Sequence, residues 1–472
     1  MKKLSFLLFI LIGLIVWQHD LLYNLIEGQN PEIVVTSEMP RGLGVAEQEI
    51  EIRLFDRHAG LKDVTVALVQ GENSFELYQQ DFPPASAEEV FTVSLPGSKL
   101  NLSEGEAEIK IVTRDRSLRT NTAEQIIKLP VDRQMPQLAI LSQQHVGSQG
   151  GAEFVIFRAN DQNIDQVGVK VGQHTFKAIR AWMIDPRFKD HDNIYVALFA
   201  IPFGFSREQD GEIQAFAKDG AGNIAQSPLT FRIASFNQAD VTPNLSDNFL
   251  DRIIPRLLPQ YGNQAGVSIE PQDRTTEGRL ENFRLINEEL RKLNDEVIQE
   301  VTSKFTPERY WDGEFKRAMA GSISSNLGEK RYYKYQEQDA SHSVHLGLDI
   351  ASVVSDVVRA AHNGRVAYTG DLGIYGNTVI IDHGLGLFTL YSHLSSIEVS
   401  EDQMVEQEES IARSGETGLA GGDHLHFEFR LGTLPVTPIE WWDAKWIQDN
   451  IDGKLDLTYQ SLTATTNPAT GS

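Results

Sequence analysis

Short runs of alternating apolar and polar residues, separated by turn residues, fill the chain from about Pro31 to Ile233. Two clear examples are residues 49–54 (EIEIRL) and residues 108–111 (EIKI). A period of two places successive side chains on opposite faces of a strand, so each run predicts a strand with one buried face. Many short strands between regular turns are typical of a β-sandwich. This half of the chain is therefore expected to be all β.

The same half of the chain carries an internal repeat. Leu61 corresponds to Ile164 at an offset of 103 residues, and further matches follow at an offset of 104. A repeat of this length predicts two tandem immunoglobulin-like β-sandwiches, at residues 30–132 and 134–236. Neither copy holds an evident set of catalytic residues. Each is therefore expected to be a spacer or a binding module, through which a regulatory protein could bind.

The first 27 residues predict a segment that meets the membrane. Met1, Lys2 and Lys3 precede an apolar run at residues 4–17. This length suits the core of a signal peptide, but no small-x-small cleavage site follows, and extension to Ile26 gives nearly the length of a tilted span. We expect an uncleaved signal anchor at residues 1–27, with a cleaved signal peptide or a buried core helix as alternatives. The lysines place the rest of the chain outside the cytoplasm.

The charge and the missing cysteine exclude several classes of function. The net charge is −24, whereas affinity for nucleic acid and docking on anionic lipid both depend on Lys and Arg. The chain has no cysteine, so disulfides and thiolate metal sites are excluded. We therefore expect no nucleic-acid partner, and any tightly held transition metal must be bound by His and carboxylate side chains.

Residues 240–310 change to a helical pattern. Apolar residues step by three or four along one stripe, at positions 283, 286, 290, 293, 297 and 301. A shorter helix is expected from Ser246 until Pro255, which bends or ends it. The stripe indicates a helical connector that packs on a neighbouring element. The alternative is that residues 240–310 cover the active site as a regulatory lid, in which case their deletion would raise activity.

Strand patterns and Gly-rich turns return from residue 311 onward. Residues 377–382 (NTVIID), for example, are followed by a turn at residues 383–386 (HGLG). The pattern predicts a mostly antiparallel β domain at residues 311–445, followed by a C-terminal extension at residues 446–472. The last ten residues, from Thr463, are rich in Thr, Ala, Asn and Gly and are expected to be frayed.

Histidines gather in this C-terminal domain. Seven of the 12 in the chain lie between His342 and His426. Histidine is the commonest metal ligand and a frequent general base, so the cluster suggests a metal site. In residues 424–430 (HLHFEFR), strict alternation predicts a strand with both histidines, the glutamate and the arginine on one face. Two surface histidines on a half-buried strand would be the alternative.

Two more segments bring histidines to the same domain. His345 and Asp349 would lie about 13 Å apart in an extended strand, too far to bind one metal ion. The chain is therefore expected to curve between them, at Gly347. His393 lies in the strand that returns after the 383–386 turn, and alternation places it on the same face as Tyr391.

Together, six segments resemble the lysostaphin and LytM type of zinc metallopeptidase, whose members cut peptide cross-links in peptidoglycan. The segments follow the family's order and spacing and cover about a quarter of the chain. They are His345-x-Gly347-x-Asp349, Tyr375-Gly376-Asn377, Asp382-His383-Gly384, Tyr391-Ser392-His393-Leu394, Gly415-Glu416-Thr417-Gly418 and His424-Leu425-His426-Phe427-Glu428.

The resemblance implies a role for each of five residues. His345, Asp349 and His426 would bind one Zn²⁺ per chain, and His393 and His424 would be catalytic. Other histidines of the domain, at positions 342, 362 and 383, match no catalytic position of the family.

The resemblance also implies an activity and a location. The substrate would be the peptide part of peptidoglycan, cut by a domain that faces the periplasm or cell exterior from an anchor in the inner membrane. Some family members have lost the site residues and act as activators of other wall enzymes. All five residues are present here, which favours an enzyme. The alternatives are a non-enzymatic cell-wall-binding activator or scaffold that uses the same groove, and a zinc peptidase that acts on proteins.

Overall fold

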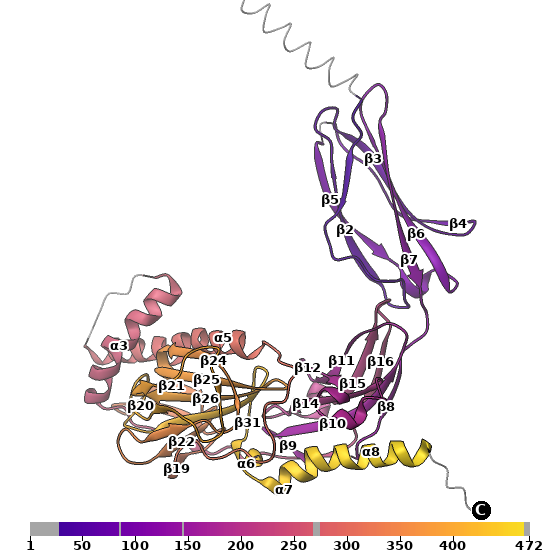
Figure 1. Cartoon of the computed structure of the whole chain (residues 1–472). Coiled ribbons are helices and arrows are strands. Elements are labelled where there is room, and N and C mark those ends of the chain that lie inside the picture. Colours follow the sequence, from indigo (N-terminus) through magenta and orange to yellow (C-terminus); the bar gives the residue numbers. More distant parts are fainter. Residues whose placement is uncertain (1–27, 85, 144–145, 268–273, 467–472) are drawn as a thin grey trace, which may run out of the picture. The chain divides into compact units, whose positions relative to one another are not determined.

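The computed structural model describes residues 28–84, 86–143, 146–267 and 274–466 (Figure 1). The predicted membrane segment at residues 1–27 lies outside them. Within the described part of the chain, no helix has both the length and the hydropathy of a membrane span. The fold is mainly β with mostly antiparallel sheets, which confirms the predicted fold class. The contacts divide the chain into two compact units.

The first unit contains a β-sandwich. One sheet has the order β1–β2–β5 (Glu32–Val35, Gln48–Phe55 and Glu88–Leu95), and the other has the order β4–β3–β6–β7 (Asn73–Asp81, Leu61–Gln70, Gly105–Asp115 and Thr122–Val131). Ile50, Ile52 and Ile109 are fully buried in one apolar cluster to which both sheets contribute. The alternating residues of the sequence therefore mark the inward faces of the two sheets.

The next strands form a second pair of sheets. One has the order β13–β14–β10–β8 (Ile179–Arg180, Ile194–Ala200, Ala152–Asn160 and Gln137–Ile140), and the other has the order β12–β11–β15–β16 (His174–Lys177, Ile164–Val171, Gln214–Asp219 and Ile224–Pro228). Strands β9 (Val146–Ser148) and β17 (Arg232–Ala234) pair in parallel beside them. The immunoglobulin-like arrangement of these sheets stays a prediction.

The helical pattern of residues 240–310 corresponds to α3 (Asp247–Ala265), α4 (Thr276–Arg284), a π-helical turn η4 (Leu285–Leu290) and α5 (Arg291–Thr302). Ser246 begins α3 as its N-cap, since its hydroxyl accepts from the amide of Phe249. Pro255 does not end this helix, which continues to Ala265. The buried apolar face of α3 stabilises the helix against the loss of one backbone hydrogen bond at proline.

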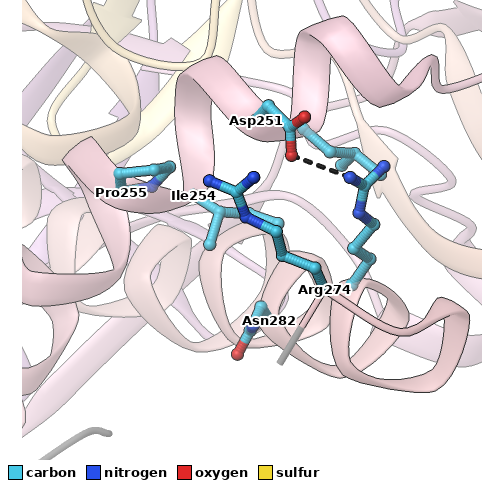
Figure 2. Close-up of a pocket in the computed structure, with 7 residues that line it drawn as sticks. Asp251, Ile254, Pro255, Arg274 and Asn282 are labelled. Atoms are coloured by element: carbon cyan, nitrogen blue, oxygen red, sulfur yellow. Dashed lines mark hydrogen bonds and ion pairs between the residues drawn. The ribbon is translucent and has the colours of Figure 1, made fainter. Parts of the chain in front are cut away.

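The helices are tied to one another and to the sheet that follows. Arg279 of α4 pairs with Asp251 of α3 at 2.9 Å, beside a small cavity between the two helices (Figure 2). Phe283 and Leu290 are fully buried in a cluster that also contains Tyr375 and Leu390 of the C-terminal domain. The apolar stripe is thus a packing face, as the first interpretation of the sequence expected.

The C-terminal domain is built on one large antiparallel sheet. Its order is β19–β22–β30–β26–β25–β24–β28 (Ser322–Ser325, Leu348–Ala351, Leu425–Leu431, Leu387–Leu394, Asn377–Gly384, Gly364–Asp371 and Met404–Val405), with β31 (Leu434–Val436) paired to β30. Two three-stranded sheets flank it. They are β18–β20–β21 (Asp240–Val241, Lys330–Tyr335 and Gln338–Val344) and β23–β29–β27 (Val357–Arg359, Ser410–Arg413 and Ser396–Ile397).

The chain ends in the helices α6 (Pro438–Trp441), α7 (Ala444–Ile447), η6 (Gln448–Asp452) and α8 (Gly453–Thr466). The prediction of a frayed tail from Thr463 is wrong for Thr463 to Thr466, which are helical; residues 467–472 lie outside the described ranges. Leu462 explains the difference, because it is buried in the same apolar cluster as Phe154 of β10 and Trp441 of α6. Tertiary packing here outweighs the polar composition of the tail.

Candidate metal centre

Neighbouring strands bring three potential ligands together. Asp349 of β22 lies directly opposite His426 of β30, so their side chains share one face of the sheet. His345 precedes β22 and turns toward the same point. Asp349 Oδ1 lies 2.9 Å from His345 Nε2 and 2.9 Å from His426 Nδ1, and these two nitrogens are 3.0 Å apart. The structure thus brings the three predicted ligands together.

Gly347 is required here for space. A Cβ atom at this position would lie 2.5 Å from the carbonyl oxygen of Phe427 and 2.9 Å from Cε1 of His426. The sequence interpretation assigned the glycine to a bend in the chain. In the structure it lets the segment between His345 and Asp349 approach β30 closely enough for the side chains to meet.

The second ring nitrogen of each histidine fixes which nitrogen faces the site. His345 Nδ1 lies 2.9 Å from the carbonyl oxygen of Asn326, and His426 Nε2 lies 2.8 Å from Glu428 Oε1. Carbonyl and carboxylate oxygens only accept, so both of these nitrogens carry the proton. The nitrogens that point at each other and at Asp349 are therefore unprotonated in the neutral rings, and their lone pairs converge with a carboxylate oxygen on one small volume.

Such a donor set fits a zinc ion. In a tetrahedral site with bonds of about 2.0 Å to N and O ligands, ligand atoms lie roughly 3.3 Å apart. The observed separations of 2.9 to 3.0 Å are close to that spacing. Three protein ligands with one open position is also the usual composition of a catalytic zinc site.

The carboxylate of Asp349 is subject to opposing effects on its pKa. Burial by itself would raise the pKa of Asp349, but the charges and hydrogen bonds of His345 and His426 hold that pKa well below its usual value. Arg331 of β20 contacts the other carboxylate oxygen, Oδ2, at 3.0 Å. Asp349 is therefore ionised, with Oδ1 directed at the histidines and Oδ2 held by a guanidinium.

A chain of buried polar contacts extends from His426 to the helices. Glu428 Oε2 accepts from Arg430 Nε at 2.7 Å, and Arg430 Nη2 reaches Asp295 of α5 at 3.1 Å. Burial would lower the pKa of His426, but Asp349 and Glu428 raise it to about 9. Burial would likewise raise the pKa of Glu428, but Arg430 and His426 lower it to about 2. Glu428 is therefore a charged partner of the histidine.

His393 and His424 lie beside the three ligands. The two rings are 4.8 Å apart between centroids, and His424 Nε2 is 3.6 Å from Asp349 Oδ1. Each donates from Nδ1 to a backbone carbonyl at 2.8 Å, His393 to Thr417 and His424 to Gly422. Nε2 is therefore the basic nitrogen of both rings.

The position of His393 departs from the strand pattern. Tyr391 pairs with Phe427 and Ser392 pairs with His426 across β26 and β30, so simple alternation would turn His393 to the face of Tyr391, away from His426. His393 instead has a positive φ of 62°, and its ring lies 5.8 Å from that of His426. The prediction that His393 and Tyr391 share a face is therefore wrong. A left-handed backbone at a non-glycine residue costs roughly 1–2 kcal/mol.

A cavity of about 140 Å³ opens over these side chains. All five residues of the predicted site line it, together with Arg291, Arg331, Tyr333 and Tyr375 from the surrounding elements. Of the other histidines in the domain, His383 is fully buried elsewhere, where burial lowers its pKa to about 3 and its ring contacts Thr389 and the Asn363 carbonyl. His342 and His362 are also absent from the cavity wall.

Comparison with known proteins identifies the part of the chain that carries this site. The family model described as "Peptidase family M23" matches residues 343–438, which hold all three potential metal ligands as well as His393 and His424. Residues 343–438 form an M23 peptidase domain. The resemblance drawn from the six sequence segments is thereby confirmed.

The M23 domain is similar to those of several bacterial proteins. It is 41% identical over 96 residues to the DD-carboxypeptidase/endopeptidase Mpg of Neisseria meningitidis serogroup B, covering 20% of this chain and 22% of Mpg. Over 118 residues, this chain is 35% identical to the peptidoglycan DD-endopeptidase ShyA of Vibrio cholerae, a match that covers 25% of this chain and 27% of ShyA. Over 103 residues, this chain is 36% identical to the murein hydrolase activator NlpD of Escherichia coli, a match that covers 22% of this chain and 27% of NlpD. The chain thus matches about a quarter of the length of these relatives.

Several residues at the site lie outside the M23 match and were not found from the sequence. Arg331 comes from β20, while Arg291 and Asp295 come from α5. The helical stripe marks which face of α5 packs inward, but it does not reveal which element receives that face. The sequence did indicate that Glu428 and Arg430 lie on the same face of the strand as His426, because they follow it by two and four residues.

Proposed function

We propose that this chain is a zinc-dependent endopeptidase that hydrolyses amide bonds in the peptide cross-links of bacterial peptidoglycan. The observation that carries the proposal is the convergence of three lone-pair atoms, from His345, Asp349 and His426, under a cavity that two further histidines line. Similarity of the M23 domain to Mpg and ShyA supports peptidoglycan as the substrate. The same similarity supports a location of the domain outside the cytoplasm.

His345, Asp349 and His426 would hold the zinc ion. When bound, zinc would polarise the scissile carbonyl and lower the pKa of a water molecule. The chain supplies the proton transfers. His424 Nε2, next to Asp349, and His393 Nε2 beside it are both placed to take a proton from the attacking water, and the ring that has taken the proton can then donate it to the leaving nitrogen.

The protonation state of His393 suits this task. Burial, together with the charges of His424 and His426, holds its pKa well below the usual value, so the ring is neutral at pH 7. Its Nδ1–H bond to Thr417 keeps it in the tautomer with a free Nε2. A neutral imidazole held in one tautomer can accept a proton without first losing one.

Digestion of purified sacculi tests the proposal. The zinc-loaded full chain is expected to release muropeptides, a chelator should stop the release, and mass analysis of the products should locate the cut bond. A His393→Ala variant should bind zinc but release muropeptides at least about 100-fold more slowly. A chain that binds zinc and leaves sacculi intact would contradict the proposal.

A non-enzymatic activator is the second candidate, because NlpD is a murein hydrolase activator. In that case the chain would bind sacculi without releasing peptides, and it would accelerate an added wall hydrolase. Retention of all five site residues argues against this candidate. A panel of protein substrates, assayed in parallel, would reveal a peptidase with a different preference.

A further inference from the structure

Helix α5 contributes a cation to the wall of the catalytic cavity. Arg291, the first residue of α5, lines this cavity together with His345, His393 and His424. It lies outside the M23 match at residues 343–438 and belongs to the helical segment that precedes the domain. The helices therefore form part of the substrate-facing surface.

Among the residues that the structure describes, Asn287 holds the guanidinium of Arg291 and no charged side chain pairs with it. Its Nε donates to the carbonyl oxygen of Asn287 at 3.0 Å and its Nη2 to Asn287 Oδ1 at 2.7 Å. Asn287 is itself fully buried and donates to Ser341 Oγ at 2.8 Å on β21. A neutral, buried amide thus orients one edge of the guanidinium, and Nη1 makes no hydrogen bond to any other described residue.

The other arginine of the cavity is already paired. Arg331 contacts Asp349 at 3.0 Å and Glu329 at 3.7 Å, whereas no carboxylate within the described ranges forms an ion pair with Arg291. Asp295 lies one turn along α5, but one of its carboxylate oxygens contacts Arg430 and the other contacts Gln299. The free charge in the cavity is therefore positive, in a chain whose net charge is −24.

We propose that Arg291 binds a free carboxylate of the substrate, next to the amide that is cut. This inference rests on the proposed function and specifies its substrate class: an acidic peptide rather than a neutral one. Guanidinium is planar and matches a carboxylate with two parallel N–H donors, which makes it more selective for this group than an ammonium. Arg291 lines the same cavity of about 140 Å³ as the three converging side chains, which places the recognised carboxylate near the scissile bond.

The segment that carries Arg291 is rigidly joined to the M23 domain. Asn294 of α5 is fully buried and accepts from the amide of Ile374 at 2.9 Å, and Arg252 of α3 pairs with Glu416 at 2.6 Å, in the loop that precedes His424. The first contact is to Ile374, which lines the cavity, and the second is to the loop at Glu416. They place Arg291 as a fixed wall of the cleft, which suits recognition of a substrate.

The test uses a peptide dimer purified from sacculi and the same dimer with every free carboxylate converted to an amide. The zinc-loaded full chain should cleave the acidic dimer with a kcat/KM about 10- to 100-fold higher than the amidated dimer, the range of a charge-assisted hydrogen bond. Arg291→Ala should lose most of this preference, mainly through a higher KM on the acidic dimer. Arg291→Lys should keep part of it, because it keeps the charge but not the planar fork.

Arg284→Ala is the matched control. Arg284 is an exposed arginine of α4 that pairs with Glu281 and does not line the cavity. This variant should cleave both dimers as the unchanged protein does. Thermal unfolding of all variants identifies any that fail to fold, and Arg291→Lys then serves in place of Arg291→Ala.

Binding separates this inference from the proposed function. In a His393→Ala background, calorimetry should show tighter binding of the acidic dimer than of the amidated one, and Arg291→Ala should remove the difference. If the chain cleaves neither dimer but shows this difference in binding, the endopeptidase proposal fails and the carboxylate site stands. Equal handling of the two dimers by the unchanged protein, or a preference that survives in Arg291→Ala, would overturn the carboxylate site.

Discussion

His426 donates from Nε2 to Glu428 Oε1 at 2.8 Å, across two positions of the same strand. This bond holds the imidazole with Nδ1 directed at Asp349 and His345. Glu428 is in turn held by Arg430, whose other end reaches Asp295 on α5. The orientation of His426 therefore depends on a chain of alternating charges that begins at the partly exposed Asp295 of the helical segment and continues through the buried Arg430 and Glu428.

Loss of the negative charge at Glu428 should weaken zinc binding. Glu428→Gln keeps the size and an acceptor oxygen but removes the charge that favours the Nε2–H tautomer of His426. We expect the affinity for zinc to fall about tenfold, the lower end of the range for partners of metal ligands. Competition with a chelating dye measures the zinc affinity of the variant and of the unchanged protein. Glu398→Gln, which alters a surface ion pair with Arg413, is the control, and equal affinities in the two variants would contradict this role.

His393→Ala should separate catalysis from metal binding. The ring donates to Thr417 and stands beside His424, but it is not one of the three converging ligands. We expect peptide release to fall by about 10²- to 10⁴-fold, as for loss of a general acid or base, with zinc content unchanged. Metal analysis of the purified variant checks that its zinc content is unchanged. A variant that loses its zinc would reassign His393 to the ligand set.

The backbone at His393 gives an independent prediction for stability. Since φ is 62°, glycine fits this position better than any residue with a Cβ atom. His393→Gly should therefore be about 1 kcal/mol more stable than His393→Ala, although glycine usually destabilises a strand. Denaturant unfolding of the two variants measures the difference. A less stable glycine variant would mean that the strained conformation is absent in solution.

His393 also shows where prediction from the sequence reaches its limit. Strand alternation predicts that His426 and Glu428 share one face of β30, and in the structure the two side chains are in contact on that face. The same rule failed on β26, because the left-handed backbone at His393 turns its side chain to the opposite face of the strand. The pattern of apolar residues in the sequence does not indicate such a conformation. His393 was assigned to the site from the family resemblance alone.

Contacts between segments that are distant in the sequence are the second feature that the sequence does not predict. The stripe from Phe283 to Val301 predicted a packing helix, and Phe283 is fully buried. The polar residues of that helix carried no such signal, so the placement of Arg291 in the cavity and of Asp295 against Arg430 emerged only from the fold. Which elements meet is decided by packing between distant segments, and a local period does not encode it.

Asn294 tests whether the helices are a removable lid. Its Oδ1 accepts from the buried amide of Ile374, next to Tyr375 at the cavity. Asn294→Ala would leave that amide without a partner, at a cost of about 1–3 kcal/mol. We expect a lower free energy of unfolding and no gain in peptide release. A rise in activity, here or on deletion of residues 240–310, would support the lid instead.

Glu440 should make the stability of the second unit depend on pH. Glu440 belongs to α6, and its carboxylate accepts from the amide of Ala152 at 2.8 Å and from Ser148 Oγ at 3.1 Å, both at the edge of the neighbouring sandwich. Burial raises its pKa from 4.5 to about 7. Because the folded state holds the proton more tightly than the unfolded state, the stabilisation is complete below about pH 4.5 and is lost as the pH rises through 7.

Between pH 5 and pH 8 this group should cost the folded state about 2 kcal/mol. Glu440→Gln cannot ionise, so its free energy of unfolding should fall less over that interval than that of the unchanged protein. Urea unfolding at the two pH values measures both slopes. Glu289→Gln, at an exposed position of η4, should leave the slope unchanged. If Glu440→Gln follows the same slope as the unchanged protein, Glu440 keeps an ordinary pKa, and its two hydrogen bonds outweigh its burial.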